Sequence, residues 1–327
     1  MPEQTVIEAV RATMQAEMQR DDSVILLGED VGSRGGVFLA SDGLIDEFGE
    51  DRVIDTPLAE SSICGVAIGA AVNGLRPIAE IQFADFVWPA INQLVGEASK
   101  VRYGTNGVKT APMTVRVPYG GGVRGGLYHS QSIEVLFAHT PGLSVVAPAT
   151  PYDAKGLLAS AIRSEDPVIV LEHKRTYRLV KGDVPDEDYT IPIGKAEIKR
   201  PGTDLSIFTY GLMLHYALQA AEMASAQGVD VEVVDLRTLR PLDEDAIAES
   251  ASRTGKALIV QEDTPAVSIS SEVAAIIGER CFFDLDGPIT RLGPPEIPPM
   301  PFSPIQEAAF MPSPEKILAA IIKLAEL

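Results

Sequence analysis

The sequence has little cysteine and no long hydrophobic run. Its 327 residues include two cysteines, Cys64 and Cys281, which excludes a disulfide-rich scaffold and any Cys-x-x-Cys zinc or redox motif. The apolar stretch 63–75 is shorter than the roughly 18 residues that indicate a membrane span, and its small residues are typical of a buried helix. The N-terminus has no basic and apolar leader pattern. We therefore expect a cytoplasmic protein that does not associate with membranes.

Positive charge is also scarce. The chain carries 27 Lys and Arg against 46 Asp and Glu, a net charge of −19, which argues against nucleic acid or an anionic membrane surface as a partner. Residues 202–327 hold 8 basic and 19 acidic side chains, a net charge of −11. This acidity has two interpretations, solubility or a docking surface for a basic partner.

Strand and helix signals alternate along the first half of the chain. Short apolar strands are predicted at 23–27, 77–83, 113–117, 143–146 and 168–172, separated by helices at 5–20, 59–75, 86–102, 132–138 and 152–163. Buried parallel strands that alternate with helices indicate a doubly wound α/β domain.

The second half repeats the α/β pattern after a break. Residues 181–201 are rich in proline and acidic residues and are predicted to form a linker. Strands at 205–209, 231–235 and 257–261 then alternate with helices at 212–225, 243–254 and 270–280. We expect a domain over 1–180, a linker over 181–201 and a second α/β domain over 202–327.

A glycine-rich segment follows the strand at 113–117. Gly120 to Gly125 matches the dinucleotide-binding pattern GxGxxG. However, Pro118 and Tyr119 separate it from the strand, no helix is predicted to begin at Gly125, and the next strand does not end in an acidic residue. A dinucleotide-dependent oxidoreductase is therefore the weaker alternative. The glycines are better explained by close approach to a large flat group or to another chain.

Two titratable residues are candidates for chemistry. His129 follows the glycines in a polar cluster, and a neutral imidazole can move protons near pH 7, although a lone histidine is more often structural. Glu60 lies in the first turn of the small-residue helix, where Gly65 and Gly69 leave a face for close packing. A carboxyl at such a seam tends to have a raised pKa and can donate a hydrogen bond. A favourable interaction with the helix dipole explains Glu60 equally well.

The end of the strand at 77–83 also carries candidate ligand contacts. Gln82 lies at the end of this strand and Phe86 follows it, at the edge where α/β folds bind ligands. Phe86 can stack on an aromatic ligand or belong to the core.

Together these segments resemble the beta subunits of the thiamine-diphosphate-dependent 2-oxo acid dehydrogenases. The resemblance covers nearly the whole chain, with matching runs LGEDVG (27–32), DTPLAE (55–60), AEIQFADF (79–86), GGLYHSQS (125–132), PGLSVVAP (141–148), PYDAKGLL (151–158), DPVIVLEHKRTYR (166–178) and VVDLRTLRPLD (233–243). It implies a transketolase-type pyrimidine-binding domain followed by a transketolase C-terminal domain. It also implies an α2β2 heterotetramer, in which this chain meets an alpha subunit and a second beta subunit.

The resemblance also implies how the cofactor is shared. The diphosphate- and magnesium-binding motif, GDG followed by NN, is missing from this sequence, so the alpha subunit is expected to hold Mg²⁺ and the diphosphate. This chain is expected to hold the aminopyrimidine through Glu29, Leu58, Glu60, Gln82 and Phe86. Glu60 is similar to the glutamate that hydrogen-bonds the pyrimidine N1′ and activates the cofactor. His129 is similar to the histidine that acts in acyl transfer to lipoamide.

Three further implications concern ions, docking and substrate. Some family members bind a structural potassium ion, and the matching positions here are Ala161, Ser164 and Asp166, where relatives carry Asp and Asn in place of the last two. The acidic C-terminal domain is expected to dock a basic domain of the lipoyl acyltransferase core. The runs QFADF and LYHSQS favour a branched-chain 2-oxo acid, with pyruvate or acetoin dehydrogenase as alternatives. A scaffold without catalytic activity is the remaining alternative.

Overall fold

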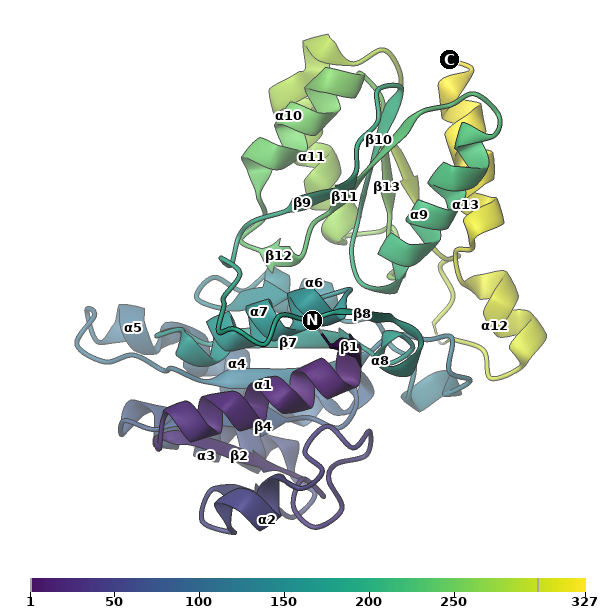
Figure 1. Cartoon of the computed structure of the whole chain (residues 1–327). Helices are drawn as coiled ribbons and strands as arrows, with labels where there is room; N and C mark the ends of the chain where they lie inside the picture. Colours follow the sequence, from purple (N-terminus) through teal and green to yellow (C-terminus); the bar gives the residue numbers. More distant parts are fainter. Residues whose placement is uncertain (1, 299) are drawn as a thin grey trace. The chain divides into compact units, whose positions relative to one another are not determined.

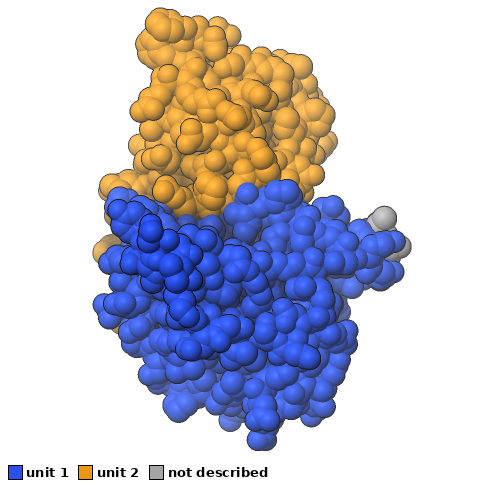
Figure 2. Space-filling model, turned by 90° about the vertical axis from the view of Figure 1, so that its left-hand side faces the viewer, with its two compact units in different colours: residues 1–119, 136–193 blue, residues 120–135, 194–327 orange. Residues whose placement is uncertain are grey.

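The computed structural model describes residues 2–298 and 300–327, which form two compact units (Figure 2). Unit 1 consists of the chain up to Tyr119 and of Leu136–Ile193, and unit 2 consists of Gly120–Val135 and the chain from Gly194 onward. The segment 120–135, with the glycines and His129, therefore groups with the C-terminal half of the chain. The predicted domain limits, drawn at 180 and 202, remain predictions.

Unit 1 contains a parallel sheet, as the alternating pattern predicted. Its strands run in the order β6-β7-β5-β4-β2-β3, and each neighbouring pair is parallel. The strands are β2 (Val24–Gly28), β3 (Val53–Asp55), β4 (Arg76–Glu80), β5 (Thr114–Tyr119), β6 (Ser144–Val146) and β7 (Val168–His173). β5 continues through Pro118, which we expected to end it; Pro118 stays in register with Glu172 of β7.

Two helix pairs pack with this sheet. α1 (Val6–Arg20) packs against α7 (Pro151–Arg163), and α3 (Glu60–Val72) packs against α4 (Trp88–Gly96) (Figure 1). α1 begins with a capping box, in which Thr5 and Glu8 satisfy each other's backbone N–H groups. The core between α1, α7 and the sheet includes Met14, Leu26 and Val170. Short helices are α2 (Leu44–Phe48), α6 (Glu134–Ala138) and α8 (Thr176–Leu179).

The predicted helix at 86–102 is not continuous. The structure divides this region into the 3-10 turn η1 (Ala84–Phe86), α4, a second 3-10 turn η2 (Ala98–Lys100) and α5 (Val101–Gly104). The break follows Gly96, and glycine is a poor helix former because it loses the most backbone freedom.

The predicted linker contributes strands at both of its ends. β8 (Lys181–Asp183) pairs antiparallel with β1 (Glu3–Thr5) in unit 1, and β9 (Glu197–Arg200) pairs antiparallel with β11 (Val231–Asp235) in unit 2. These strands are short and polar, so their sequence carries no apolar periodicity. Their pairing depends on neighbours far away in the sequence.

Unit 2 is a second α/β layer structure. Its sheet has the order β14-β13-β10-β11-β9, where β10 (Leu205–Thr209), β11, β13 (Ala257–Val260) and β14 (Thr290–Leu292) are parallel. α9 (Leu212–Ser225) and α13 (Pro314–Ala325) lie on one side, and α10 (Glu244–Thr254) and α11 (Ile269–Cys281) lie on the other (Figure 1). α12 (Pro304–Phe310) follows the proline-rich segment, within which residue 299 lies outside the described residues.

The described part of the chain contains no helix that is both long and apolar enough to span a membrane.

Candidate functional site

Glu29 and Gln82 lie together in unit 1. Glu29 directly follows β2, and Gln82 lies just beyond β4, the neighbouring parallel strand. The Gln82 side-chain amide donates a hydrogen bond to the Glu29 carbonyl oxygen at 3.3 Å. Because the carboxyl ends of parallel strands meet at one edge of a sheet, two segments 53 residues apart meet here.

Glu60 lies near Glu29. Burial raises the pKa of the Glu29 carboxyl, and the negative charges of Asp30 and Glu60 raise it further. Burial also raises the pKa of the Cys64 thiol to about 12, and the Glu60 charge contributes to this shift. The two carboxyls are therefore close enough to interact electrostatically.

Apolar side chains lie in the same segments. Leu58, two residues before α3, is 70% exposed. Phe86 is half-buried in η1, and its ring meets the Phe83 ring edge-on at 5.6 Å between centroids. A flat apolar group in contact with these side chains would remove apolar surface from water.

α3 has an exposed, uncharged face in this chain. The sequence predicted a helix buried all round, but Val66 is 60% exposed, and a Cβ at Gly69 would meet nothing within 4 Å among the described residues. Residues 61–75 contain no charged side chain. An exposed apolar helix face of this kind is typical of an interaction surface.

His129 belongs to unit 2. It follows the 3-10 turn η3 (Gly126–Tyr128) and is half-buried, while Leu127 and Tyr128 beside it are 47% and 69% exposed. Two of the glycines before it, Gly120 and Gly122, have φ values of +83° and +74°, a region that residues with side chains rarely adopt. The glycines therefore shape the chain that leads to His129.

Arginines contact the stretch predicted to hold a cation. Arg76 donates hydrogen bonds to the carbonyl oxygens of Ile162 and Ser164 at 3.2 and 2.9 Å. The Ala161 carbonyl accepts from the Ser164 N–H at 3.1 Å, and Asp166 pairs with Arg102 at 2.6 Å. Among the described residues, no group of three or more His, Cys, Asp or Glu side chains could hold a metal ion.

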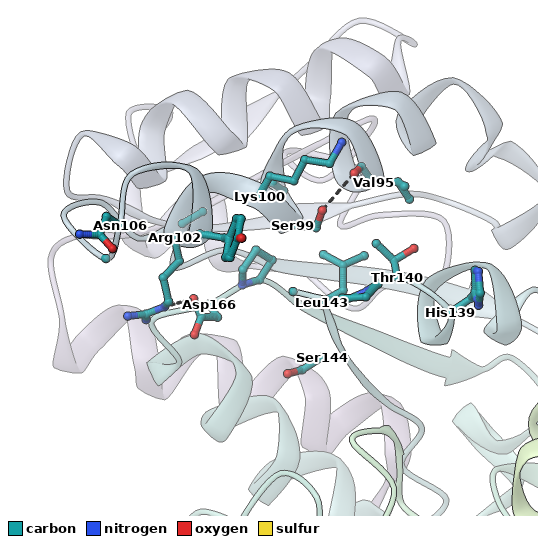
Figure 3. Close-up of a pocket in the computed structure, with 17 residues that line it drawn as sticks. Val95, Ser99, Lys100, Arg102, Asn106, His139, Thr140, Leu143, Ser144 and Asp166 are labelled. Atoms are coloured by element: carbon teal, nitrogen blue, oxygen red, sulfur yellow. Dashed lines mark hydrogen bonds and ion pairs between the residues drawn. The ribbon is translucent and has the colours of Figure 1, made fainter.

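Unit 1 also contains a cavity of about 1340 Å³ (Figure 3). Its walls come from the α4–α5 region and the loop after it, the segment 139–144, and residues 166 and 167. The Arg102–Asp166 pair lies at one end, and His139 lies at the other. Of the predicted site residues, Asp166 lines this cavity. The sequence did not predict the cavity itself, because the cavity walls come from segments far apart along the chain.

Comparison with known proteins identifies the family. The model of the transketolase pyrimidine-binding domain matches residues 3–180, and that of the transketolase C-terminal domain matches residues 194–317. The chain is 60% identical over 320 residues to the 2-oxoisovalerate dehydrogenase subunit beta of Bacillus subtilis, with 98% of each chain covered. The chain belongs to the family of 2-oxo acid dehydrogenase beta subunits.

Other members of this family and a solved structure agree with the assignment. The pyruvate dehydrogenase E1 component subunit beta of Bacillus subtilis is 47% identical over 326 residues and the whole of both chains. The corresponding Staphylococcus aureus subunit is 47% identical over 292 residues, 89% of this chain and 90% of the relative. A solved chain described as a split gene transketolase, inactive beta4 tetramer, has a TM-score of 0.79 at 23% identity and covers 99% of this chain and 98% of its own.

The predicted family and fold class are therefore confirmed. The GxGxxG match at Gly120 lies within a chain of transketolase type, and the structure begins a 3-10 turn, rather than an α-helix, after Gly125. The residue roles implied by the family remain predictions.

Proposed function

We propose that this chain is the beta subunit of a branched-chain 2-oxo acid dehydrogenase. With an alpha subunit, it decarboxylates a 2-oxo acid and transfers the remaining acyl group to a lipoyl group. The observation that carries this proposal is the 60% identity, over 98% of both chains, to a subunit named for 2-oxoisovalerate. The 47% identity to pyruvate dehydrogenase subunits supports pyruvate as the second candidate substrate.

The edge of the unit 1 sheet fits the aminopyrimidine half of thiamine diphosphate. This half is a flat ring with polar nitrogens, and the segments here offer apolar surface at Leu58 and Phe86 and polar groups at Glu60 and Gln82. When bound, thiamine diphosphate supplies the electron-accepting chemistry that allows a 2-oxo acid to lose CO₂. We assign Glu60 to hold a proton at N1′ of the pyrimidine; Glu29 lies close by, and the Glu60 charge helps to raise the pKa of its carboxyl.

A second chain is needed to complete this site. The sequence lacks the motif that binds Mg²⁺ and diphosphate, so we assign both to an alpha subunit. The exposed, uncharged face of α3 supports such a partner, because burial of Val66 and of the glycine backbone would stabilise an interface by the hydrophobic effect. We propose an α2β2 assembly that also contains a second copy of this chain.

His129 is proposed to act in acyl transfer. In that step the substrate carbon bonds to one lipoyl sulfur, the S–S bond breaks, and the other sulfur takes a proton. The two electrons left by decarboxylation thus reduce the disulfide, and the substrate carbon reaches the oxidation level of a thioester. A half-buried imidazole can supply that proton near pH 7.

A monovalent cation remains part of the proposal. We assign it to Ala161, Ser164 and Asp166, where Arg76 competes for the Ser164 carbonyl and Arg102 competes for the Asp166 carboxylate.

The lipoyl acyltransferase core is proposed to dock on unit 2. Residues 202–327 have a net charge of −11 and expose Phe282 and Phe283 by 67% and 96% beside Asp284. Net negative charge together with exposed aromatic side chains suits a basic binding domain. Raising the salt concentration should weaken this docking, and binding that does not depend on salt would argue against it.

The cytoplasm is the proposed location. Cys64 and Cys281 are both buried and free, which suits a reducing compartment.

The function is tested by producing the chain together with an alpha subunit that carries the GDG and NN motifs. Turnover of 3-methyl-2-oxobutanoate and pyruvate, which lose CO₂, and of acetoin, which is cleaved without loss of CO₂, is then measured with an artificial electron acceptor and added thiamine diphosphate. We expect the highest kcat/KM for the branched substrate. A higher kcat/KM for pyruvate or acetoin would instead assign the chain to a pyruvate or acetoin dehydrogenase. No turnover of any substrate would favour a scaffold without catalytic activity.

A further inference from the structure

Two carboxylates from distant segments hold the glycine loop, residues 120–126. Glu262, two residues after β13, accepts a hydrogen bond from the Gly121 N–H at 2.5 Å. Glu307 of α12 accepts from the N–H groups of Gly122 and Arg124 at 3.1 and 3.0 Å, both at Oε1. All of these residues belong to unit 2. Three backbone donors of one short loop are thus bound by two side chains more than 130 residues away.

The loop needs such restraint because of its composition and its backbone. Five of its seven residues are glycine, so the free loop would have many conformations available. Arg124 has a φ of +60°, a left-handed conformation that is uncommon for a residue with a side chain. The N–H groups of Gly122 and Arg124 converge on one carboxylate oxygen, as in backbone nests that bind anions, and Glu307 supplies that oxygen from within the chain.

Apolar contacts from the same C-terminal segment cover the loop. A Cβ on Gly121 would overlap the Met300 side chain, and a Cβ on Gly126 would lie 3.2 Å from the Phe302 ring. Met300, Phe302 and Glu307 together therefore contact the loop from one stretch of eight residues.

Both carboxylates are buried, and Glu262 lies among other acidic groups. Glu262 is 4% exposed and Glu307 is 6% exposed. Burial raises the pKa of Glu134 well above its usual value, and the charges of Asp263 and Glu262 add to that shift. Burying carboxylates is costly unless hydrogen bonds compensate. Hydrogen bonds to the glycine loop contribute to this compensation.

His129 lies three residues beyond this loop and is tied to it through the backbone. The Gly120 N–H donates to the Gln131 carbonyl at 3.0 Å, which closes the segment that contains His129. A Cβ on Gly125 would lie 2.6 Å from the His129 carbonyl oxygen, so the two backbones are in close contact. A shift of the loop would therefore move His129.

We propose that Glu307, assisted by Glu262, is a positioning residue that holds the glycine loop and thereby keeps His129 in place for acyl transfer to the lipoyl group. This inference rests on the proposed function of His129. In this role the Glu307 side chain holds a glycine loop that would otherwise be flexible. The restraint matters for His129 because a group that moves a proton must be held within a fraction of an ångström to act efficiently.

The first test measures the loop directly. Hydrogen–deuterium exchange of the segment 120–126 is compared in the assembled enzyme for the wild type, Glu307→Ala, Glu307→Gln and Glu315→Ala. We expect exchange at least tenfold faster in E307A and near wild-type exchange in E307Q, because glutamine keeps an acceptor oxygen. E315A is the matched control: Glu315 is exposed in the same unit and accepts locally from Ser313 Oγ at 2.7 Å. Unchanged exchange in E307A would overturn the proposal.

The second test separates the two half-reactions. Decarboxylation is measured with an artificial electron acceptor, and acyl transfer is measured on a lipoyl domain. We expect E307A to lower kcat for acyl transfer at least tenfold more than it lowers decarboxylation, with E307Q restoring most of the loss. If E307A does not fold, Glu307→Asp replaces it, since it keeps the charge but shortens the side chain.

The outcomes distinguish this inference from the proposed function. Equal losses in both half-reactions, or unchanged acyl transfer despite faster exchange, would overturn the positioning role. A wild-type enzyme that performs neither half-reaction would overturn the proposed function, and the exchange experiment would still report whether Glu307 holds the loop.

Discussion

Arg116 donates two hydrogen bonds to Glu172, each 2.7 Å long, and both side chains are almost completely buried in the unit 1 sheet. Glu80 accepts a further bond from the same guanidinium at 2.5 Å, and the Tyr177 hydroxyl donates to Glu172 at 2.5 Å. These groups come from β4, β5, β7 and α8, so the cluster joins three adjacent strands. The glutamate of β4 lies two residues before Gln82, which connects this cluster to the candidate cofactor site.

Removing the cation of this cluster should strongly destabilise the chain. Arg116→Met leaves two buried carboxylates without their partner, and the loss of one member of a buried pair costs about 3–5 kcal/mol. The urea midpoint of unfolding, followed by circular dichroism, should fall accordingly. The control is Arg102→Met, which removes the exposed pair with Asp166 and should change the midpoint little. Equal shifts for the two variants would contradict a structural role for the cluster.

Glu60→Gln should nearly abolish decarboxylation in the assembled enzyme. Glutamine preserves the shape of the side chain but cannot give or take the proton assigned to N1′, and proton transfer of this kind contributes about 10²–10⁴-fold to rates. Steady-state turnover with an artificial electron acceptor measures the effect. The matched variant Glu97→Gln changes an exposed carboxylate at the end of α4 and should retain activity within about twofold. Full activity of E60Q would remove Glu60 from the mechanism.

Asp263 should make the stability of unit 2 depend on pH. Burial raises its pKa to about 6, and the Glu262 charge adds to the shift. In the unfolded chain the pKa of an aspartate is about 3.9, so between these values the folded state holds more protons. The free energy of unfolding should therefore fall as pH rises towards about 6, and this loss persists above it.

Asp263→Asn removes this contribution and keeps an acceptor for the Thr264 N–H. The variant should have a higher urea midpoint than the wild type at pH 7.5, and the difference should shrink as the pH is lowered to 5.5. Asp51→Asn, at an exposed position of unit 1, serves as the control. A difference that stays constant with pH would show that Asp263 does not titrate in this range.

Arg76 should decide how the chain responds to potassium. Its guanidinium donates to the carbonyl oxygens of Ile162 and Ser164, atoms of the kind that a monovalent cation would use. Arg76→Met frees them, so added KCl should raise the thermal midpoint of the variant more than that of the wild type, with NaCl at equal concentration as control. Equal responses of both proteins would show that Arg76 does not compete with a cation here.

Much of the fold could be predicted because its signals are local. The strands β2 and β13 are short apolar runs, and α1, α7 and α9 have regular apolar periodicity, so their existence and approximate limits followed from the sequence. β1, β8 and β9 could not be predicted, because short polar strands exist only through pairing with distant partners. The predicted helix at 86–102 failed where Gly96 and the residues after it favour tighter turns.

The sequence by itself determined the family, the alternating α/β pattern and the residue types of the candidate site, since these depend on which side chains follow which strands. The tertiary structure decided which of them meet: Glu29 with Gln82, Arg116 with Glu172, and the glycine loop with Glu262 and Glu307. The physical reason is that hydrogen bonds and burial act over a few ångströms, and chain positions separated by dozens to almost two hundred residues come that close only when the chain folds.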